Sequence, residues 1–125
     1  MDGPVLQRIA INTALTLPGS LQSQPFGPDY EVFKVGGKIF MMTTDVPGPQ
    51  IVTLKCNQDR SMMLREVYPS ITPGYHMNKR HWISIAAAPE LAENLITDLV
   101  EHSYELVVRA LPRGRHPSKK YSTCR

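Results

Sequence analysis

The segment 72–85 concentrates residue types that could do chemistry. Its 14 residues, TPGYHMNKRHWISI, hold two histidines, a lysine, an arginine, an asparagine, a tyrosine and the only tryptophan of the chain. Imidazoles exchange protons near neutral pH, basic side chains bind anions, and aromatic rings offer a flat apolar surface with a polar edge. The segment therefore suits a catalytic site, a nucleic-acid-binding surface or a packed corner. We take residues 76–81 as its candidate functional surface.

Catalysis is the least supported of these functions. His76, His81 and His102 could serve as general acids or bases, and Cys56 or Ser61 could be nominated as a nucleophile. However, the sequence has no GxSxG, Walker A or HExxH motif and no paired-carboxylate signature. We therefore favour a non-enzymatic protein without a cofactor.

The spacing of cysteine and histidine argues against a bound metal. Cys56 and Cys124 form no CxxC pair, and neither lies near His76 or His81 in the sequence. Structural zinc sites take four such ligands, usually at short spacings. We expect no metal and two free thiols, because two cysteines so far apart do not make a disulfide framework.

A nucleic-acid-binding surface would draw on basic residues from a β-hairpin and strand, a short helix and the 72–85 segment. Lysine and arginine neutralise phosphates and release counterions, which gives affinity without reading sequence, and asparagine can reach a base edge. The same charges would also suit an ordinary solvated surface. The candidate nucleic-acid-binding residues are Lys34, Lys38, Lys55, Arg60, Arg65, Asn78, Lys79 and Arg80.

The alternative is a binding module for a small anionic ligand or a protein partner. Its candidate ligand surface consists of Tyr75, His76, His81 and Trp82. Because side chains alternate along a strand, His81 and Trp82 should lie on opposite faces. We expect Trp82 to be a core residue whose indole N–H is bonded to a loop carbonyl.

Length and composition predict one domain of a soluble protein. The chain has 125 residues, of which 42% are hydrophobic and 20% charged, and no apolar run reaches the roughly 20 residues of a membrane helix. No signal-peptide pattern opens the sequence, so we expect a cytoplasmic protein. Residues 109–125 hold six basic and no acidic residues, so this segment carries +6 and the rest of the chain −3. We expect a single domain over 1–112 and a basic, disordered tail over 113–125.

Sequence periodicity predicts a two-layer α+β fold with helices on one face of a mainly antiparallel sheet. The hairpin is the clearest element, because Gly36-Gly37 separates two β-rich runs. A further short strand is possible between residues 67 and 80. The expected order is α-β-β-β-α-β-α, with helices over 4–16, 58–67 and 89–111 and strands over 30–44 (a hairpin), 51–56 and 81–87.

Individual residues in these elements have expected structural roles. Asn57 should cap the helix over 58–67, and Arg60 should pair with an acid on the long last helix. The methionines Met62 and Met63 should fill the core. In the turn-rich connector over 21–29, Phe26 should anchor the loop to the core.

Three blocks of the sequence, taken in order, resemble the MmcQ/YjbR family. They are PFGPDYEVFKVGGKIF (25–40), LKCNQDRSMMLREVYPSITPGYHMNKRHWISI (54–85) and DLVEHSYELVVRALP (98–112), within a likeness that spans residues 17–112. The resemblance implies a small bacterial, cytoplasmic protein whose two-layer α+β fold is similar to that of secretion chaperones.

The same resemblance implies DNA as the partner. The family is described as DNA-binding, from a double-wing shape in which β-hairpins would flank the duplex. We therefore expect a monomer that binds duplex DNA electrostatically through its hairpin wings and basic loop, with no membrane or metal partner. The alternative, an anionic ligand or protein partner at residues 76–82, stays open.

Overall fold

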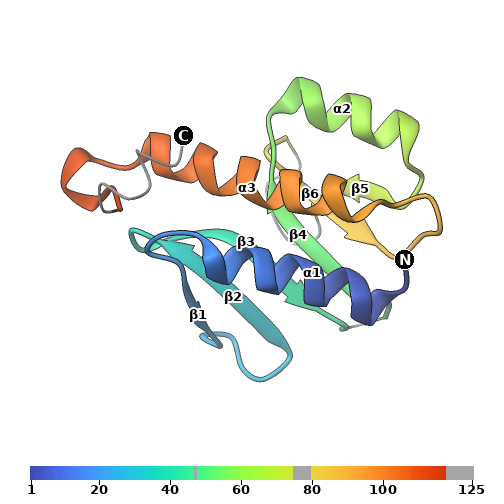
Figure 1. Ribbon diagram of the computed structural model, residues 1–125, viewed down its shortest axis with the longest axis horizontal. Coiled ribbons are helices and arrows are strands. Elements are labelled where there is room, and N and C mark those ends of the chain that lie inside the picture. The colour runs from blue at the N-terminus through green and yellow to red at the C-terminus, as the bar shows by residue number, and fades with distance from the viewer. Residues whose placement is uncertain (47, 75–79, 118–125) are drawn as a thin grey trace.

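The computed structural model describes residues 1–46, 48–74 and 80–117 (Figure 1). The helices are α1 (Gly3–Thr16), α2 (Gln58–Val67), α3 (Glu93–Ala110) and the short 3-10 helix η1 (Arg113–Arg115). The strands are β1 (Leu21–Ser23), β2 (Tyr30–Val35), β3 (Lys38–Thr44), β4 (Ile51–Lys55), β5 (Ile71–Pro73) and β6 (Trp82–Ala86). No helix in these ranges is both long and apolar enough to cross a bilayer.

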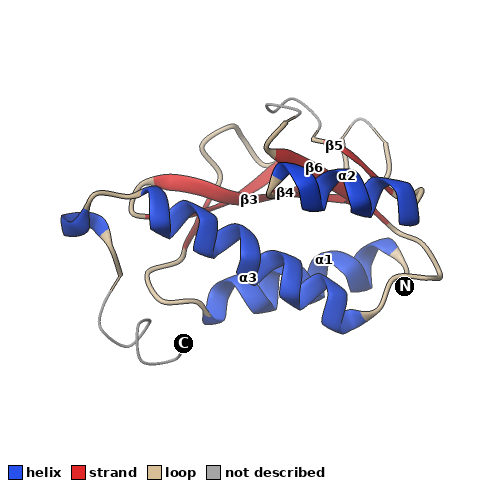
Figure 2. Ribbon diagram, turned by 90° about the horizontal axis from the view of Figure 1, so that it is seen from above, coloured by secondary structure: helices blue, strands red, loops and turns tan. Residues whose placement is uncertain are grey.

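The strands form one antiparallel sheet in the order β1-β2-β3-β4-β6-β5. Helices α1 and α3 pack side by side over one face of this sheet, and α2 lies at its β5 edge (Figures 1 and 2). The predicted two-layer α+β architecture, with a mainly antiparallel sheet, is confirmed.

The core lies between the sheet and the pair α1 and α3. A row of cross-strand neighbours supplies the sheet side, because Phe33, Met41, Leu54 and Ile83 pair in succession from β2 to β6 and all are buried. Helix α1 contributes Leu6, Ala10 and Ala14 to this core, and their spacing of four places them on one face of the helix. Helix α3 buries a longer stripe over the same row, consisting of Ile96, Leu99, Val100, Ser103, Tyr104, Val107 and Val108.

Two local predictions are confirmed by backbone geometry. Gly36 and Gly37 join β2 to β3 with φ of 57° and 83°, which is the pair of positive values that a two-residue primed turn requires. Asn57 caps α2, where its side-chain oxygen accepts from the N–H groups of Asp59 and Arg60.

The element order has two strands more than the seven-element order predicted. Residues 21–23, placed in a turn-rich connector, form β1 and pair with β2. Such a short, polar strand has no alternating pattern to reveal it. The second addition, β5, is the short strand anticipated between residues 67 and 80. Helix α3 begins at Glu93 rather than at Pro89, since Leu91 N–H closes a turn on Ala88 C=O.

Three residues expected in the core lie at the surface. Phe26 is 60% exposed, and Met62 and Met63 are 51% and 65% exposed. The methionines were misplaced because α2 lies at the sheet edge and buries only Ser61 and Leu64. The opposite side of a helix packed along one narrow face is left to solvent.

Candidate functional site

A gap in the sheet lies where β3 and β4 part. Their ladder ends at the pair Met41 and Leu54. If the ladder continued, the next backbone pair would be Phe40 and Lys55. Instead, the Ser103 hydroxyl of α3 accepts from the Lys55 N–H at 2.8 Å and donates to the Phe40 carbonyl at 2.5 Å. The hydroxyl replaces one rung of the ladder and holds the two strands apart.

A β-bulge at the start of β3 opens the gap further. The β2–β3 ladder slips by one residue between Phe33 and Lys34, and the extra residue on β3 is Phe40. Its ring packs edge-to-face on Tyr104 of α3, with ring centroids 5.4 Å apart. A bulge bends its strand and increases the local twist, which turns the start of β3 away from β4.

Beyond the Ser103 bridge lies a groove of about 530 Å³. Its floor is the end of α3, where Val107, Ala110 and Leu111 follow Ser103 by four, seven and eight residues. Residues at these spacings share one helix face, so the stripe that fills the gap also lines the groove.

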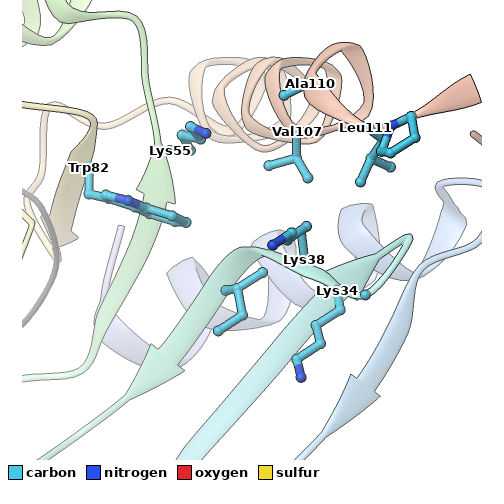
Figure 3. A pocket seen from close by; sticks show the side chains of 10 residues that line it. Lys34, Lys38, Lys55, Trp82, Val107, Ala110 and Leu111 are labelled. Atoms are coloured by element: carbon cyan, nitrogen blue, oxygen red, sulfur yellow. The ribbon is translucent and has the colours of Figure 1, made fainter. Parts of the chain in front are cut away.

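The walls of this groove carry three lysines and a tryptophan. Lys34 and Lys38 come from the β2–β3 hairpin, and Lys55 and Trp82 are cross-strand partners on β4 and β6. Figure 3 shows Lys55 and Trp82 on one side and the hairpin lysines on the other. We call this site, defined by these four residues over the α3 floor, the lysine groove.

The electrostatics of the lysine groove favour anions. None of the described residues that line it is acidic, and beside the three lysines all but the Trp82 indole are glycine, aliphatic residues or proline. A concave surface with charges of one sign over low-dielectric walls focuses the field and concentrates counter-ions. The lysine groove can therefore bind a phosphate or carboxylate ligand.

Trp82 is not the core residue that the sequence led us to expect. It is half-buried and lines the lysine groove. The reason is the alternation along β6, which gives the helix-covered face to Ile83 and Ile85 and turns Trp82 away from it. Gly74 fixes the Trp82 backbone, because its N–H bonds to the Trp82 carbonyl at 2.8 Å and a Cβ there would lie 2.5 Å from Trp82 Cβ.

The tip of the β2–β3 hairpin is packed rather than projecting. A Cβ on Gly36 would lie 2.5 Å from Leu111 Cδ1 and 3.0 Å from the Arg115 carbonyl oxygen. Residues 113–117, expected to be disordered, instead carry η1 and a 2.9 Å hydrogen bond between His116 Nε2 and the Leu111 carbonyl. This close docking holds the hairpin against α3, and residues 118–125 lie outside the described ranges.

The other predicted basic residues lie elsewhere. Arg60 is hydrogen-bonded to Asp98 of α3, which confirms the predicted pairing with an acid on the long helix. Arg65 Nε donates to the Ser61 carbonyl within α2 at 3.3 Å. Neither arginine lines the lysine groove. Arg80 and His81 are exposed just before β6. Four further candidates lie outside the described residues: Tyr75, His76, Asn78 and Lys79.

Two residues that the sequence nominates for catalysis, His102 and Cys56, lie close to the start of α2. The Asn57 N–H lies 3.4 Å from His102 Nε2, which accepts in the neutral form. Burial, helped by the Arg60 charge, lowers the pKa of His102, so the neutral form is favoured. Burial raises the pKa of Cys56, a free thiol, which disfavours the thiolate that a nucleophile needs.

Sequence reasoning missed Ser103 and the apolar floor of the lysine groove. Ser103 is fully buried and connects two strands that are far from it in sequence. Its one visible signal was a hydroxyl within the apolar stripe of a long helix. Val107 and Leu111 carried no signal at all, because core and groove residues of one stripe have the same chemistry.

The chain is thus a two-layer α+β protein whose antiparallel sheet opens over the last helix. A family model described as YjbR matches residues 15–106, so the chain belongs to the YjbR family. This result confirms the resemblance seen in the sequence.

Relatives span nearly the whole chain. The uncharacterized protein YbdF of Escherichia coli O157:H7 is 44% identical over 113 residues, covering 90% of this chain and 93% of the relative. The uncharacterized protein YjbR of Escherichia coli K12 is 30% identical over 98 residues, covering 78% and 83%.

Solved structures share the fold. The Deinococcus radiodurans protein DR2400 matches with a TM-score of 0.76 and 31% identity, over 87% of this chain and 81% of that one. A Pseudomonas syringae protein matches with a TM-score of 0.69 and 28% identity, over 80% and 96%.

Proposed function

We propose that this protein binds DNA non-enzymatically and holds the sugar–phosphate backbone at the lysine groove. The observation that carries the proposal is that Lys34, Lys38 and Lys55 line one concave site whose described lining holds no acid. Each ammonium group can neutralise one phosphate and release a counter-ion, so the affinity is electrostatic and little dependent on sequence.

The surface beside the lysine groove extends its positive charge. Arg109, Arg113 and Arg115 are exposed at the end of α3 and in η1, next to the groove residues Ala110 and Pro112. A strand bound at the groove would pass through this field, which adds steering and affinity at low salt.

The described part of the lining holds no histidine, carboxylate, hydroxyl or thiol, which favours binding over catalysis.

A small anionic ligand is a second candidate for the same site. Its volume of about 530 Å³ and its apolar floor match small-molecule pockets, which occupy about 300–1,000 Å³ and are mostly apolar with few polar groups. Saturable binding of a small phosphate compound, together with indifference to DNA, would favour this candidate.

The test is fluorescence anisotropy on a labelled generic duplex at about 50 and about 200 mM salt. Three neutralised phosphates give a slope of about −2.7 in log K against log salt, so this fourfold rise should weaken binding about 40-fold. The variant with Lys34→Ala, Lys38→Ala and Lys55→Ala should lose most of that affinity, and Arg65→Ala on α2 is the matched control.

Two results would contradict the proposal. One is the absence of duplex binding by the intact chain at low salt. The other is equal binding by the triple variant and the intact chain. A chain ending at Pro117 should still bind, because the described residues that form the lysine groove are all retained.

A further inference from the structure

We infer that the lysine groove receives an unpaired nucleobase, stacked on Trp82 with its flanking phosphates on the lysines. This inference rests on the proposed DNA binding and deepens it, because it predicts a preference for single strands over fully paired duplex. Neither the fold nor the electrostatics alone requires that preference. It follows from the aromatic ring, the apolar floor and the placement of the charges.

The first support is the aromatic ring at the site. Trp82 is the aromatic residue of the described lining, and its half-buried indole faces the groove beside Lys55. In proteins that bind single strands, successive bases stack on aromatic side chains, whatever the base, within a positively charged groove. Trp82 and the three lysines combine both features in one site.

The second support is the apolar floor. Val107, Ala110 and Leu111 offer aliphatic surface at the bottom of the groove. A sugar–phosphate chain is hydrated and makes no use of such a surface, whereas a base has broad faces that are poorly solvated. A base inside a duplex is stacked on both faces, so it can enter a pocket only when it is unpaired or extruded.

The third support is the distribution of the lysines. Lys34 and Lys38 stand on the hairpin wall, and Lys55 stands on the opposite wall next to Trp82 (Figure 3). The phosphates on the two sides of an inserted base leave in opposite directions. Charges on both walls therefore suit a strand that passes over the groove while one base points into it.

The fourth support is that the walls are held in place. Gly36 packs on Leu111 behind the hairpin wall, Gly74 locks the Trp82 backbone, and Ser103 fixes the spacing between β3 and β4. A site held by close packing and buried hydrogen bonds needs little reorganisation on binding, which favours affinity.

Trp82 is the only tryptophan of the chain, so its fluorescence reports directly on this groove. The probes are an oligothymidylate of about 12 nucleotides, a duplex of the same length, and thymidine 5′-monophosphate, compared with the full chain at about 50 mM salt. We expect the single strand to bind about tenfold more tightly than the duplex and to quench the emission. The mononucleotide should quench only at much higher concentration, since it has one phosphate.

The variants separate this inference from the proposed function. Trp82→Ala should bring the affinity for the single strand down to that for the duplex, as measured by anisotropy, and so abolish the preference. Trp82→Phe should keep part of the preference and provides a second variant if the alanine variant fails to fold. Phe26→Ala, which removes an exposed aromatic ring outside the groove, should behave like the intact chain.

The outcomes are distinct. Salt-sensitive duplex binding with no tighter binding of the single strand, or with an unchanged preference in Trp82→Ala, would overturn the inference and leave the proposed function standing. If the intact chain bound neither the single strand nor the duplex, both the inference and the proposed function would be overturned. Equal affinity for the mononucleotide and the oligonucleotide would also overturn the inference, because the strand would add nothing.

Discussion

The lysine groove and helix α2 both carry basic residues that the sequence makes candidates for nucleic-acid binding. The two regions differ in what surrounds these residues in the structure. In the lysine groove, Lys34, Lys38 and Lys55 line a concave surface whose described lining holds no acid. On α2, Arg60 is bonded to Asp98 and Arg65 to a backbone carbonyl of its own helix. A basic residue thus serves ligand binding or packing according to what the neighbouring elements bring to it.

The two regions also differ in how they are held. The lysine groove depends on Ser103, a fully buried hydroxyl that joins backbone groups of two strands. The attachment of α2 uses a pair in which the Arg60 and Asp98 side chains are 32% and 61% exposed. Buried hydrogen bonds are costly to leave unmade, whereas exposed ion pairs contribute little.

Removal of the Ser103 hydroxyl should have the largest effect. Ser103→Ala leaves the Lys55 N–H and the Phe40 C=O without their partner, which should lower the free energy of unfolding by about 2–4 kcal/mol in urea denaturation. The matched control on α2 is Ser61→Ala, because the buried Ser61 hydroxyl has no partner among the described residues. If both substitutions cost the same, the bridge is not what holds the strands.

A single lysine should change DNA binding by a smaller, measurable amount. Lys38→Ala should reduce the salt slope of duplex binding by about 1, since one phosphate contact is lost. Arg65→Ala should leave the slope unchanged, because Arg65 lies outside the groove. Equal salt slopes for the two variants would show that the groove and α2 do not differ in phosphate contacts, against this expectation.

The ion pair on α2 should contribute little to stability. Arg60→Ala should lower the free energy of unfolding by less than about 1 kcal/mol, as exposed pairs do, and the effect should shrink at high salt. DNA binding by this variant should match that of the intact chain. A large loss of DNA affinity would show that Arg60 belongs to the DNA-binding surface, so that this surface includes α2 as well as the lysine groove.

The smallest expected effect is a pH dependence at His102. Its pKa is lowered in the folded state, first by burial and then by Arg60 and Arg109, against the opposing charges of Asp98 and Glu105. The unfolded chain then binds the proton more readily, so stability is full above about pH 6.5 and falls as the pH drops below it.

Urea denaturation at about pH 7.5 and about pH 5.5 tests this expectation. The intact chain should be less stable at the lower pH, because burial and the Arg60 charge disfavour the protonated form of His102. His102→Gln, which keeps an acceptor but does not titrate, should show a smaller loss. The same loss in both proteins would assign the effect to other groups.

Some of the structure follows from local chemistry, which is why it was predictable. Gly36-Gly37 takes positive φ at low cost, so a hairpin follows from two residues and their flanks. Asn57 caps α2 because its side chain reaches the first N–H groups of the helix that follows it. Both outcomes depend on neighbours within a few positions.

The burial of single side chains was predicted poorly, because it depends on how elements dock. Met62 and Met63 look like core residues until α2 is placed at the edge of the sheet. Trp82 has a large aromatic side chain of the kind expected in a core, but the alternation along β6 gives the helix-covered face to Ile83 and Ile85. For Trp82 the neighbours Ile83 and Ile85 carry that signal, whereas no residue near Met62 and Met63 in the sequence shows where α2 docks.

The sequence alone determined the α+β class, the hairpin, the capped helix and the charge of Lys34, Lys38 and Lys55. Only the tertiary structure decided that these lysines share one groove with Trp82 and that Arg60 does not. The physical reason is the Ser103 bridge and the bulge at Phe40, which part β3 from β4 and expose the end of α3 between them. Contacts across such distances in sequence come from packing, and packing is a property of the assembled elements.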